Sequence, residues 1–245
     1  MTYFLSGQSL RQGQDAVLEG AEARHITSAR RMRPGERFAL QDPEGNRFEA
    51  ELLDGGRNPV VRVGAPIPPP PLPPLNLVLL QGAVKDKAAE TIIQKAAELG
   101  AAEVVLFPGR HSTLAHKELS HPGYTERLTR IAWEACKQCD RQFPPVITLT
   151  SGLSAALAHS PPADLNWVCH PKQAVPARVA LNQTTGPSSA RVLVGPEGGL
   201  APDEVEEALR AGFMAVEMGA LVLRADTATV AAASLVLFGT QTERR

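Results

Sequence analysis

The chain has 245 residues, of which 43% are hydrophobic and 21% are charged, and its formal net charge is −1 at pH 7. This length suits one large domain or two smaller ones, and the near-zero net charge by itself gives no argument for nucleic acid. The three cysteines exclude a disulfide framework, and their odd count with one close pair fits a reducing cytoplasm. The first residues lack the pattern of a signal peptide, and no apolar run reaches membrane-spanning length. We therefore expect a cytoplasmic protein without a membrane segment.

The first 65 residues are expected to form a small all-β barrel. Short apolar or alternating runs are separated by turn signals at Asp42-Pro-Glu-Gly45 and Asp54-Gly-Gly56, which is the pattern of such folds. The expected strands cover residues 37–41, 47–53 and 60–63. One helix is expected over residues 21–32, with Pro34-Gly35 as its stop.

Charge is distributed unevenly along the chain. Five arginines and one acid lie between Arg24 and Arg37, whereas residues 203–217 hold five acids and one arginine. Such asymmetry suggests one surface that meets a polyanion and another that does not. Arg30, Arg31 and Arg33 are the candidates for phosphate contacts, and a solvated helix face is the alternative interpretation.

The clearest boundary is the proline-rich segment 66–74. Seven of the 21 prolines fall in these nine residues, which disfavours a helix or an interior strand and favours a stiff extended spacer. After it, apolar runs of strand length alternate with runs of helical periodicity, which predicts a largely parallel sheet with helices on both faces. The expected strands are 75–80, 104–107, 146–149, 167–170, 192–194, 215–217 and 221–223, and the expected helices are 86–99, 124–138, 202–211 and 227–238, the last capped by Asp226.

Two glycine-containing segments near the C-terminus are the candidate ligand loops. Gly195-Pro-Glu-Gly-Gly199 follows an apolar run, and its glycines permit positive φ and close backbone approach to a ligand. A tight strand-to-helix turn would also explain it. The segment matches neither the dinucleotide fingerprint nor the P-loop, so the sequence gives little support for NAD or ATP as the ligand. Downstream, Arg224 stands where a strand is expected to meet a helix; it either pairs with Asp226 or creates an anion-attracting corner.

These two segments resemble the C-terminal motifs of the SPOUT methyltransferases. More narrowly, the chain resembles the RsmE family, which methylates N3 of a uridine in small-subunit ribosomal RNA. The resemblance covers almost the whole chain and includes Lys85–Gly100, Glu134–Pro145 and His25–Gly35. The family usually has Glu where this chain has Asp226, which keeps the carboxylate but shortens its reach by one methylene.

The resemblance implies an α/β protein with a PUA-like β-barrel RNA-binding domain over residues 1–65, a linker over 66–74, and a SPOUT domain over 75–245 that contains a trefoil knot. It further implies S-adenosylmethionine held in a bent form by the knot loops, and a homodimer with its active site at the subunit interface. The cofactor-binding residues implied are His170, Val194, Gly195, Glu197, Gly198, Gly199, Met218, Gly219, Leu223 and Ala225.

The function implied is methylation of uridine N3 in 16S ribosomal RNA, on the assembled small ribosomal subunit. The N3–H group is mostly protonated at neutral pH, so an enzyme must stabilise the N3 anion and align it with the methyl donor. Arg224 is the first candidate for that stabilisation. Glu197 is a possible base, although a loop-shaping or cofactor-contact role has more weight. Lys85 and Arg141 are weaker candidates for contact with RNA.

Two other functions remain open on the sequence. A SPOUT enzyme could methylate a ribose 2′-OH or a different base, and a non-catalytic ribosome-assembly factor could keep the same fold. The Cys136-x-x-Cys139 pair invites a zinc or redox interpretation, but it lacks a second pair or spaced histidines. We therefore assign no metal.

Overall fold

The structure is a computed structural model that describes residues 3–114, 119, 121–170, 174–183 and 186–240. The chain forms two compact units: Met1–Pro71 with Cys136–Phe143, and Leu72–Ala135 with Pro144–Arg245. The change from one unit to the other at Pro71 falls inside the proline-rich segment 66–74. None of the helices in the described part of the chain is long and apolar enough to cross a membrane.

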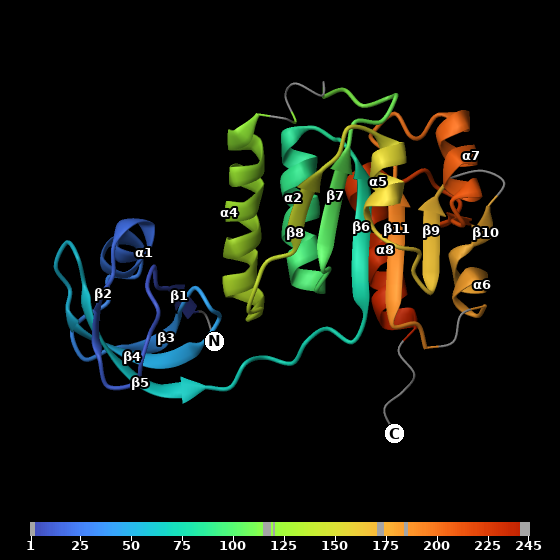
Figure 1. The fold of residues 1–245 in the computed structure, drawn as a ribbon. Helices are drawn as coiled ribbons and strands as arrows, with labels where there is room; N and C mark the ends of the chain where they lie inside the picture. The colour runs from blue at the N-terminus through green and yellow to red at the C-terminus, as the bar shows by residue number, and fades with distance from the viewer. Residues whose placement is uncertain (1–2, 115–118, 120, 171–173, 184–185, 241–245) are drawn as a thin grey trace. The chain divides into compact units, whose positions relative to one another are not determined.

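The first unit contains a curled five-stranded sheet with strand order β1-β3-β4-β5-β2 (Figure 1). Its only parallel pair among the described strands is β1 with β3, and the other pairs are antiparallel. The strands are β1 (Tyr3–Leu5), β2 (Asp15–Val17), β3 (Arg37–Gln41), β4 (Arg47–Asp54) and β5 (Val60–Ile67). Sequence analysis missed β1 and β2, because three residues are too few to show an alternating pattern.

Strand β5 includes a proline from the segment expected to act as a spacer. Pro66 pairs with Phe48 of β4, while β2 pairs only with residues 60–62 of β5. Within the described sheet, β5 therefore has no second neighbour at Pro66, and an edge position tolerates a residue without an N–H donor.

The helix of the first unit is shorter than predicted. It consists of α1 (Gly20–Arg24) followed by the π-helical turn η1 (His25–Ala29), so it does not reach residue 32. Arg31 has a φ of 52°, in the left-handed region, which ends the helix before Pro34. Ile26 is fully buried and packs with Phe38 and Leu40 in the core of this unit.

A buried arginine ties Cys136–Phe143 into the first unit. Arg47 is 5% exposed and donates hydrogen bonds to Gln41 Oε1 (2.8 Å) and to the carbonyl of Asp140 (3.1 Å). It also forms an ion pair with the Asp140 carboxylate, and its guanidinium lies 4.0 Å from the centre of the Tyr3 ring. The Tyr3 hydroxyl donates to the carbonyl of Arg141 (2.6 Å). This segment is therefore a structural part of the first unit.

The second unit is built on a seven-stranded sheet with strand order β10-β12-β9-β11-β6-β7-β8. All six pairings are parallel, as the alternation of strands and helices predicted. The strands are β6 (Asn76–Gly82), β7 (Glu103–Phe107), β8 (Val146–Leu149), β9 (Leu165–Cys169), β10 (Val175–Pro176), β11 (Ser189–Val194) and β12 (Met214–Glu217). Strand β11, although it follows β9 in the chain, lies between β9 and β6.

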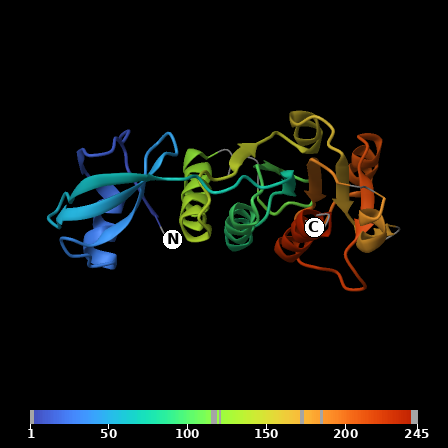
Figure 2. The ribbon, with the colours of Figure 1, turned by 90° about the horizontal axis from the view of Figure 1, so that it is seen from below.

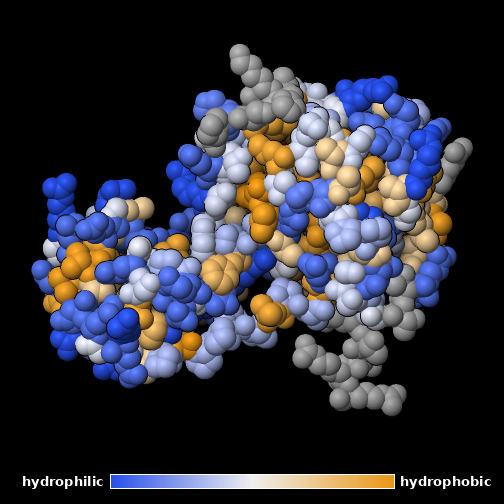
Figure 3. Space-filling view, in the orientation of Figure 1, coloured by the Kyte–Doolittle hydropathy of each residue, from blue (hydrophilic) through white to orange (hydrophobic). Residues whose placement is uncertain are grey.

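Helices cover both faces of this sheet, as predicted. They are α2 (Asp86–Leu99), α4 (Pro122–Cys139), α5 (Leu153–His159), α6 (Ala177–Leu181), α7 (Pro202–Arg210) and α8 (Ala225–Gly239). Buried residues of α2, α4, α6 and α8 form one apolar cluster, and those of α5 and α7 belong to another. Figure 2 shows α5 on one side of the sheet and α2 and α8 on the other. In the space-filling view the visible surface of each unit is mostly hydrophilic, with hydrophobic residues in small groups (Figure 3).

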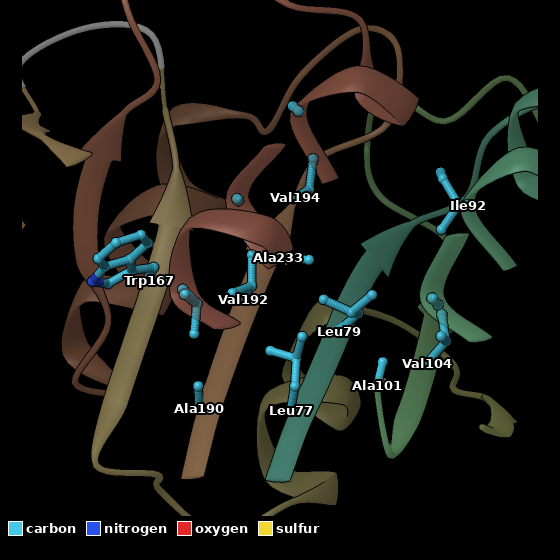
Figure 4. Packing of buried hydrophobic residues seen from close by; sticks show 14 of the residues in the cluster. Leu77, Leu79, Ile92, Ala101, Val104, Trp167, Ala190, Val192, Val194 and Ala233 are labelled. Carbon is cyan, nitrogen blue, oxygen red and sulfur yellow. The ribbon is translucent and has the colours of Figure 1, made fainter. Parts of the chain in front are cut away.

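Strand side chains alternate between the two clusters, as the period of a β-strand requires. Leu77 and Leu79 of β6 face α2 and α8, whereas Val78 and Leu80 face α5 and α7. Trp167 is the largest of the fully buried side chains and lies in the same layer as Leu77 and Leu79 (Figure 4). The sequence of β6 is apolar without alternation from Leu77 to Leu80, because both faces of this strand are buried.

Three local expectations for the second unit were wrong or incomplete. Residues 221–223 do not form a strand but an irregular loop. Helix α8 begins at Ala225, so Asp226 lies in its first turn and Arg224 occupies the N-cap position. The short elements α5, α6 and β10 were missed, since segments of two to seven residues carry little periodicity. Helix α2, in contrast, has the predicted bounds, and Gly100 ends it with a φ of 83°.

A second buried arginine supports the sheet at its amino-terminal side. Arg191 of β11 is 2% exposed, and burial lowers the pKa of its guanidinium. It donates hydrogen bonds to Asn166 Oδ1 (2.6 Å) and to the carbonyls of Ser160 (2.9 Å) and Leu157 (3.3 Å). The two carbonyls lie at the end of α5, where helices leave acceptors without intrahelical partners.

Arg191→Leu is expected to destabilise the protein by about 2 kcal/mol or more, because three buried or part-buried hydrogen bonds would be lost, two of them to the carbonyls at the end of α5. The measurement is the midpoint of urea unfolding. Arg210→Leu is the matched control, since Arg210 is 71% exposed and pairs only with Glu206 on the surface of α7 among its described contacts. The control is expected to change stability by no more than about 0.5 kcal/mol. Equal effects of the two substitutions would contradict a structural role for Arg191.

Candidate functional site

A cavity of about 370 Å³ lies at the carboxyl ends of three neighbouring strands of the second unit. This volume falls within the range of about 300–1,000 Å³ that is usual for small-molecule sites. The cavity is lined by Cys169, His170, Val194, Gly195, Pro196, Glu197, Gly198, Gly199, Leu200, Val216, Met218, Gly219, Leu221, Val222, Leu223, Ala225 and Ala228. All ten residues that sequence analysis expected to bind a cofactor are among them.

The sheet topology brings these residues together. Strands β12, β9 and β11 are adjacent and parallel, so the chain leaves all three at the same edge of the sheet. The end of β9 contributes Cys169 and His170, and the first turn of α8 closes the cavity with Ala225. His170 is fixed at the end of its strand by a hydrogen bond from its N–H to the carbonyl of Val216 (3.0 Å).

The loop Val194–Leu200, here called the glycine loop, has no room for side chains at two of its glycines. A Cβ on Gly195 would lie 2.8 Å from the nitrogen of Leu200, and one on Gly198 would lie 2.7 Å from the Cβ of His111. Gly199 has a φ of 73°, which favours glycine although the space around it is open. The loop is therefore a tight turn as well as a cavity wall, and both interpretations of its glycines apply.

Glu197 reaches out of the glycine loop toward helix α2. Its Oε1 accepts a hydrogen bond from the backbone N–H of Lys85, the N-cap residue of α2, at 2.9 Å. An anion at a helix N-terminus is stabilised by the free N–H groups and the helix dipole. This contact favours a loop-shaping role for Glu197 over that of a base.

The second cavity loop, Met218–Arg224, is irregular and exposes its apolar side chains. Leu221 is 79% exposed and Val222 is 82% exposed, although both line the cavity. Arg224 is 82% exposed, its Nε lies 3.6 Å from Oδ1 of Asp226, and it is not among the lining residues. The contact between Arg224 and Asp226, one of the two interpretations from the sequence, is therefore present in the structure. It leaves most of the Arg224 side chain open to solvent.

The other candidate residues are not among those that line the cavity. Arg30, Arg31 and Arg33 are exposed at the end of the helix of the first unit. Lys85 has an exposed side chain and contributes its backbone N–H to Glu197. Arg141 is half-buried within the first unit, and burial lowers the pKa of its guanidinium, which favours a structural role over contact with RNA.

Sequence analysis missed the loop that follows β7 and packs behind the glycine loop. The backbone N–H of Arg110 donates to Glu204 Oε1 (2.9 Å), and its guanidinium pairs with Asp203 (2.6 Å). The other oxygen of Glu204 accepts from the N–H of Ala201 (2.8 Å), so this carboxylate joins the start of α7 to the β7 loop. The signal in the sequence was the Pro108-Gly109 turn after an apolar strand, which places this loop at the same sheet edge.

Metal-binding groups were sought across the described residues, and no set of three or more His, Cys, Asp or Glu side chains is arranged to hold an ion. Of the Cys136-x-x-Cys139 pair, Cys136 is buried and Cys139 is exposed. Cys169, in the cavity wall, carries a neutral thiol, because burial raises its pKa to about 12.

The chain matches the family model of the RNA methyltransferase domain over residues 71–237 and that of the RNA methyltransferase PUA domain over residues 18–63. It is 30% identical to ribosomal RNA small subunit methyltransferase E of Mycobacterium bovis, over 95% of this chain and 88% of the relative. The structure of the enzyme of that name from Neisseria gonorrhoeae, bound to S-adenosyl methionine, is 28% identical with a TM-score of 0.81 and covers 97% of this chain and 98% of its own. A Legionella pneumophila methyltransferase structure with bound SAM has a TM-score of 0.86 at 23% identity, with 96% of each chain covered, and supports the fold alone.

Iodoacetamide at about pH 8 is expected to modify Cys139 well before Cys136 or Cys169, because the thiolate is the reactive form. Burial raises the pKa of Cys136 and of Cys169 to about 12, so both thiols stay protonated below that pH. Peptide mass spectrometry over a time course measures the three rates, and labelling after urea unfolding shows that all three sites are detectable. Modification of Cys169 as fast as Cys139 would contradict the raised pKa of this partly buried thiol.

Proposed function

The chain belongs to the ribosomal RNA small subunit methyltransferase E family, and on that premise we propose that it transfers a methyl group from S-adenosylmethionine to N3 of a uridine in 16S ribosomal RNA. The Neisseria gonorrhoeae enzyme whose structure contains S-adenosyl methionine has the same name. The substrate proposed is the assembled small ribosomal subunit.

One observation carries the proposal: the cavity has the chemistry of a S-adenosylmethionine site. Its lining, within the described residues, contains no lysine or arginine and one carboxylate, that of Glu197. Phosphate-bearing cofactors are usually held by cations or by a phosphate-binding loop, and neither is present in this lining. Apolar side chains such as Met218 and Leu223 suit an adenosyl group, and backbone N–H and C=O groups of the glycine loop can recognise its polar edges.

The proposed reaction requires two contributions from this chain besides the bound methyl donor. S-adenosylmethionine supplies the methyl group when it is bound. The glycine loop and the loop Met218–Arg224 hold that donor in one orientation, which converts the transfer into an aligned, effectively unimolecular step. Arg224, exposed at the rim of the cavity, is proposed to meet the uracil carbonyls and stabilise the negative charge that develops when the N3 proton leaves.

We propose that the active form is a homodimer in which a second copy covers the rim. Leu221 and Val222 are large apolar side chains with about four fifths of their surface exposed, in the same loop as Arg224. Exposed apolar groups beside a site are typical of interaction surfaces. The trefoil knot is also part of the proposal, and it fits the position of β11 between β9 and β6.

We propose that residues 1–65 of the first unit are the RNA-binding domain and that RNA contacts them through Arg30, Arg31 and Arg33. These side chains are exposed and close together in the chain, so they can contact several phosphates without reading sequence. The target uridine must be unpaired or flipped out, because N3 lies on the Watson–Crick edge of the base.

The decisive test is transfer of tritiated methyl groups to small ribosomal subunits from a strain that lacks this gene, with the modified nucleoside identified by chromatography. We expect N3-methyluridine, and we expect protein-free 16S ribosomal RNA to be the poorer substrate. Methylation of a ribose would indicate a SPOUT enzyme with a different target instead. Binding of S-adenosylmethionine by calorimetry without any transfer, or no binding at all, would favour an assembly factor.

Arg224→Ala is expected to lower turnover by about 100-fold or more, as loss of one group that stabilises a developing anion usually does. Its dissociation constant for S-adenosylmethionine should stay within about twofold of the wild-type value, since Arg224 is not in the cavity lining. Single-turnover kinetics and calorimetry measure the two quantities. Arg210→Ala, which removes another exposed arginine of the same unit, is the control. Equal loss of binding and turnover would show that Arg224 supports the loop rather than the reaction.

A further inference from the structure

A polar side chain lies within the apolar layer behind the cavity. Gln81 is the last residue but one of β6, and its side chain is fully buried. The alternation along β6 places it on the same face as Leu77 and Leu79, against α8. A buried amide is costly unless its donor and acceptor groups are hydrogen-bonded.

The Gln81 amide has partners on two different segments. Its Nε2 donates to the carbonyls of Gly82 (2.8 Å) and Gly195 (3.2 Å), and its Oε1 accepts from the hydroxyl of Thr229 (2.5 Å). Carbonyl oxygens only accept, so the NH₂ group must face the two glycines, and this fixes the orientation of the amide. The Thr229 hydroxyl also lies 2.8 Å from the carbonyl of Ala225, one turn earlier in α8.

These partners belong to two walls of the cavity. Gly195 is part of the glycine loop, and Ala225 and Ala228, which precede Thr229 in the first turns of α8, line the cavity as well. The end of β6 also meets the glycine loop directly, because a Cβ on Gly82 would lie 2.5 Å from the ring nitrogen of Pro196. Gln81 is thus the polar connection between the glycine loop and α8.

We propose that Gln81 is a positioning residue for S-adenosylmethionine: it holds the Gly195 carbonyl away from the cavity and keeps the glycine loop in register with the first turns of α8. The inference rests on the proposed cofactor. Without the amide, the Gly195 carbonyl has no donor in its buried position, and the loop must shift to satisfy it. Gln81 touches no lining group of the second cavity loop in the described hydrogen bonds, so its influence passes through Gly195 and α8.

The test compares Gln81→Met with the wild type. Methionine has a similar length and flexibility, so it fills the space but cannot donate to Gly195. We expect the dissociation constant for S-adenosylmethionine, measured by calorimetry well below the melting temperature, to rise about tenfold or more. Gln81→Glu should recover part of the affinity at low pH, where a protonated carboxyl can again donate one hydrogen bond, and lose it as the pH rises.

Leu77→Val is the matched control, because it loosens the same face of the same strand without touching the glycine loop. It is expected to lower the melting temperature and to leave the dissociation constant unchanged. Two outcomes would overturn the positioning role. One is a dissociation constant of Gln81→Met equal to that of the wild type. The other is weaker binding in Leu77→Val together with its lower melting temperature, because affinity would then simply follow stability. If the wild type itself does not bind S-adenosylmethionine, the proposed function is wrong. If the wild type binds it and Gln81→Met binds it equally well, only the role of Gln81 is wrong.

Discussion

The candidate site depends on one topological constraint, the position of β11 between β9 and β6. Six residue pairs join β11 to β6 and four join it to β9, so the strand is fixed on both sides. Its carboxyl end then delivers Gly195 next to the end of β9 and beside Gly82 of β6. Both cavity loops and the first turn of α8 follow from that placement, because parallel neighbours end at the same edge of the sheet. Gly195 has no side chain because the loop folds back on it, and a Cβ there would lie 2.8 Å from the nitrogen of Leu200.

Part of this arrangement could be predicted from the sequence. Helix α2 has a clear apolar face and ends before a glycine, and the glycine loop can be recognised by its three glycines. Both were therefore located correctly. Strand order could not be predicted, since residues that pair in the sheet are separated by more than 80 positions between β6 and β11. Residues 221–223 were mistaken for a strand because an apolar run carries no sign of whether it is buried or exposed. Gln81 was missed for the converse reason, since an amide at the end of an apolar run is usually a solvated strand end.

Charge serves different purposes in different parts of the molecule. The acidic stretch around α7 is partly structural: Glu204 satisfies the N–H groups of Ala201 and Arg110, and Asp203 pairs with Arg110. The buried arginines Arg47 and Arg191 satisfy carbonyls that would otherwise lack donors. Among the cations considered for function, Arg224, Lys85 and the arginines at the end of the first helix keep their charge in solvent, whereas Arg141 is half-buried. Burial therefore separates structural cations from those available to a polyanion.

The place of β11 also has a consequence for the order in which the chain can fold during synthesis. Strands β6 and β9 leave the ribosome well before residues 189–194, yet their inner edges cannot pair until β11 arrives. Until then two strand edges with strongly apolar sequences are unsatisfied, which is the condition under which nascent chains associate wrongly. The half of the sheet formed by β6, β7 and β8 can pair earlier, since those strands are consecutive in the chain and adjacent in space. The sheet and the ligand cavity are therefore both completed late in synthesis, since β12, the loop Met218–Arg224 and α8 also follow β11 in the chain.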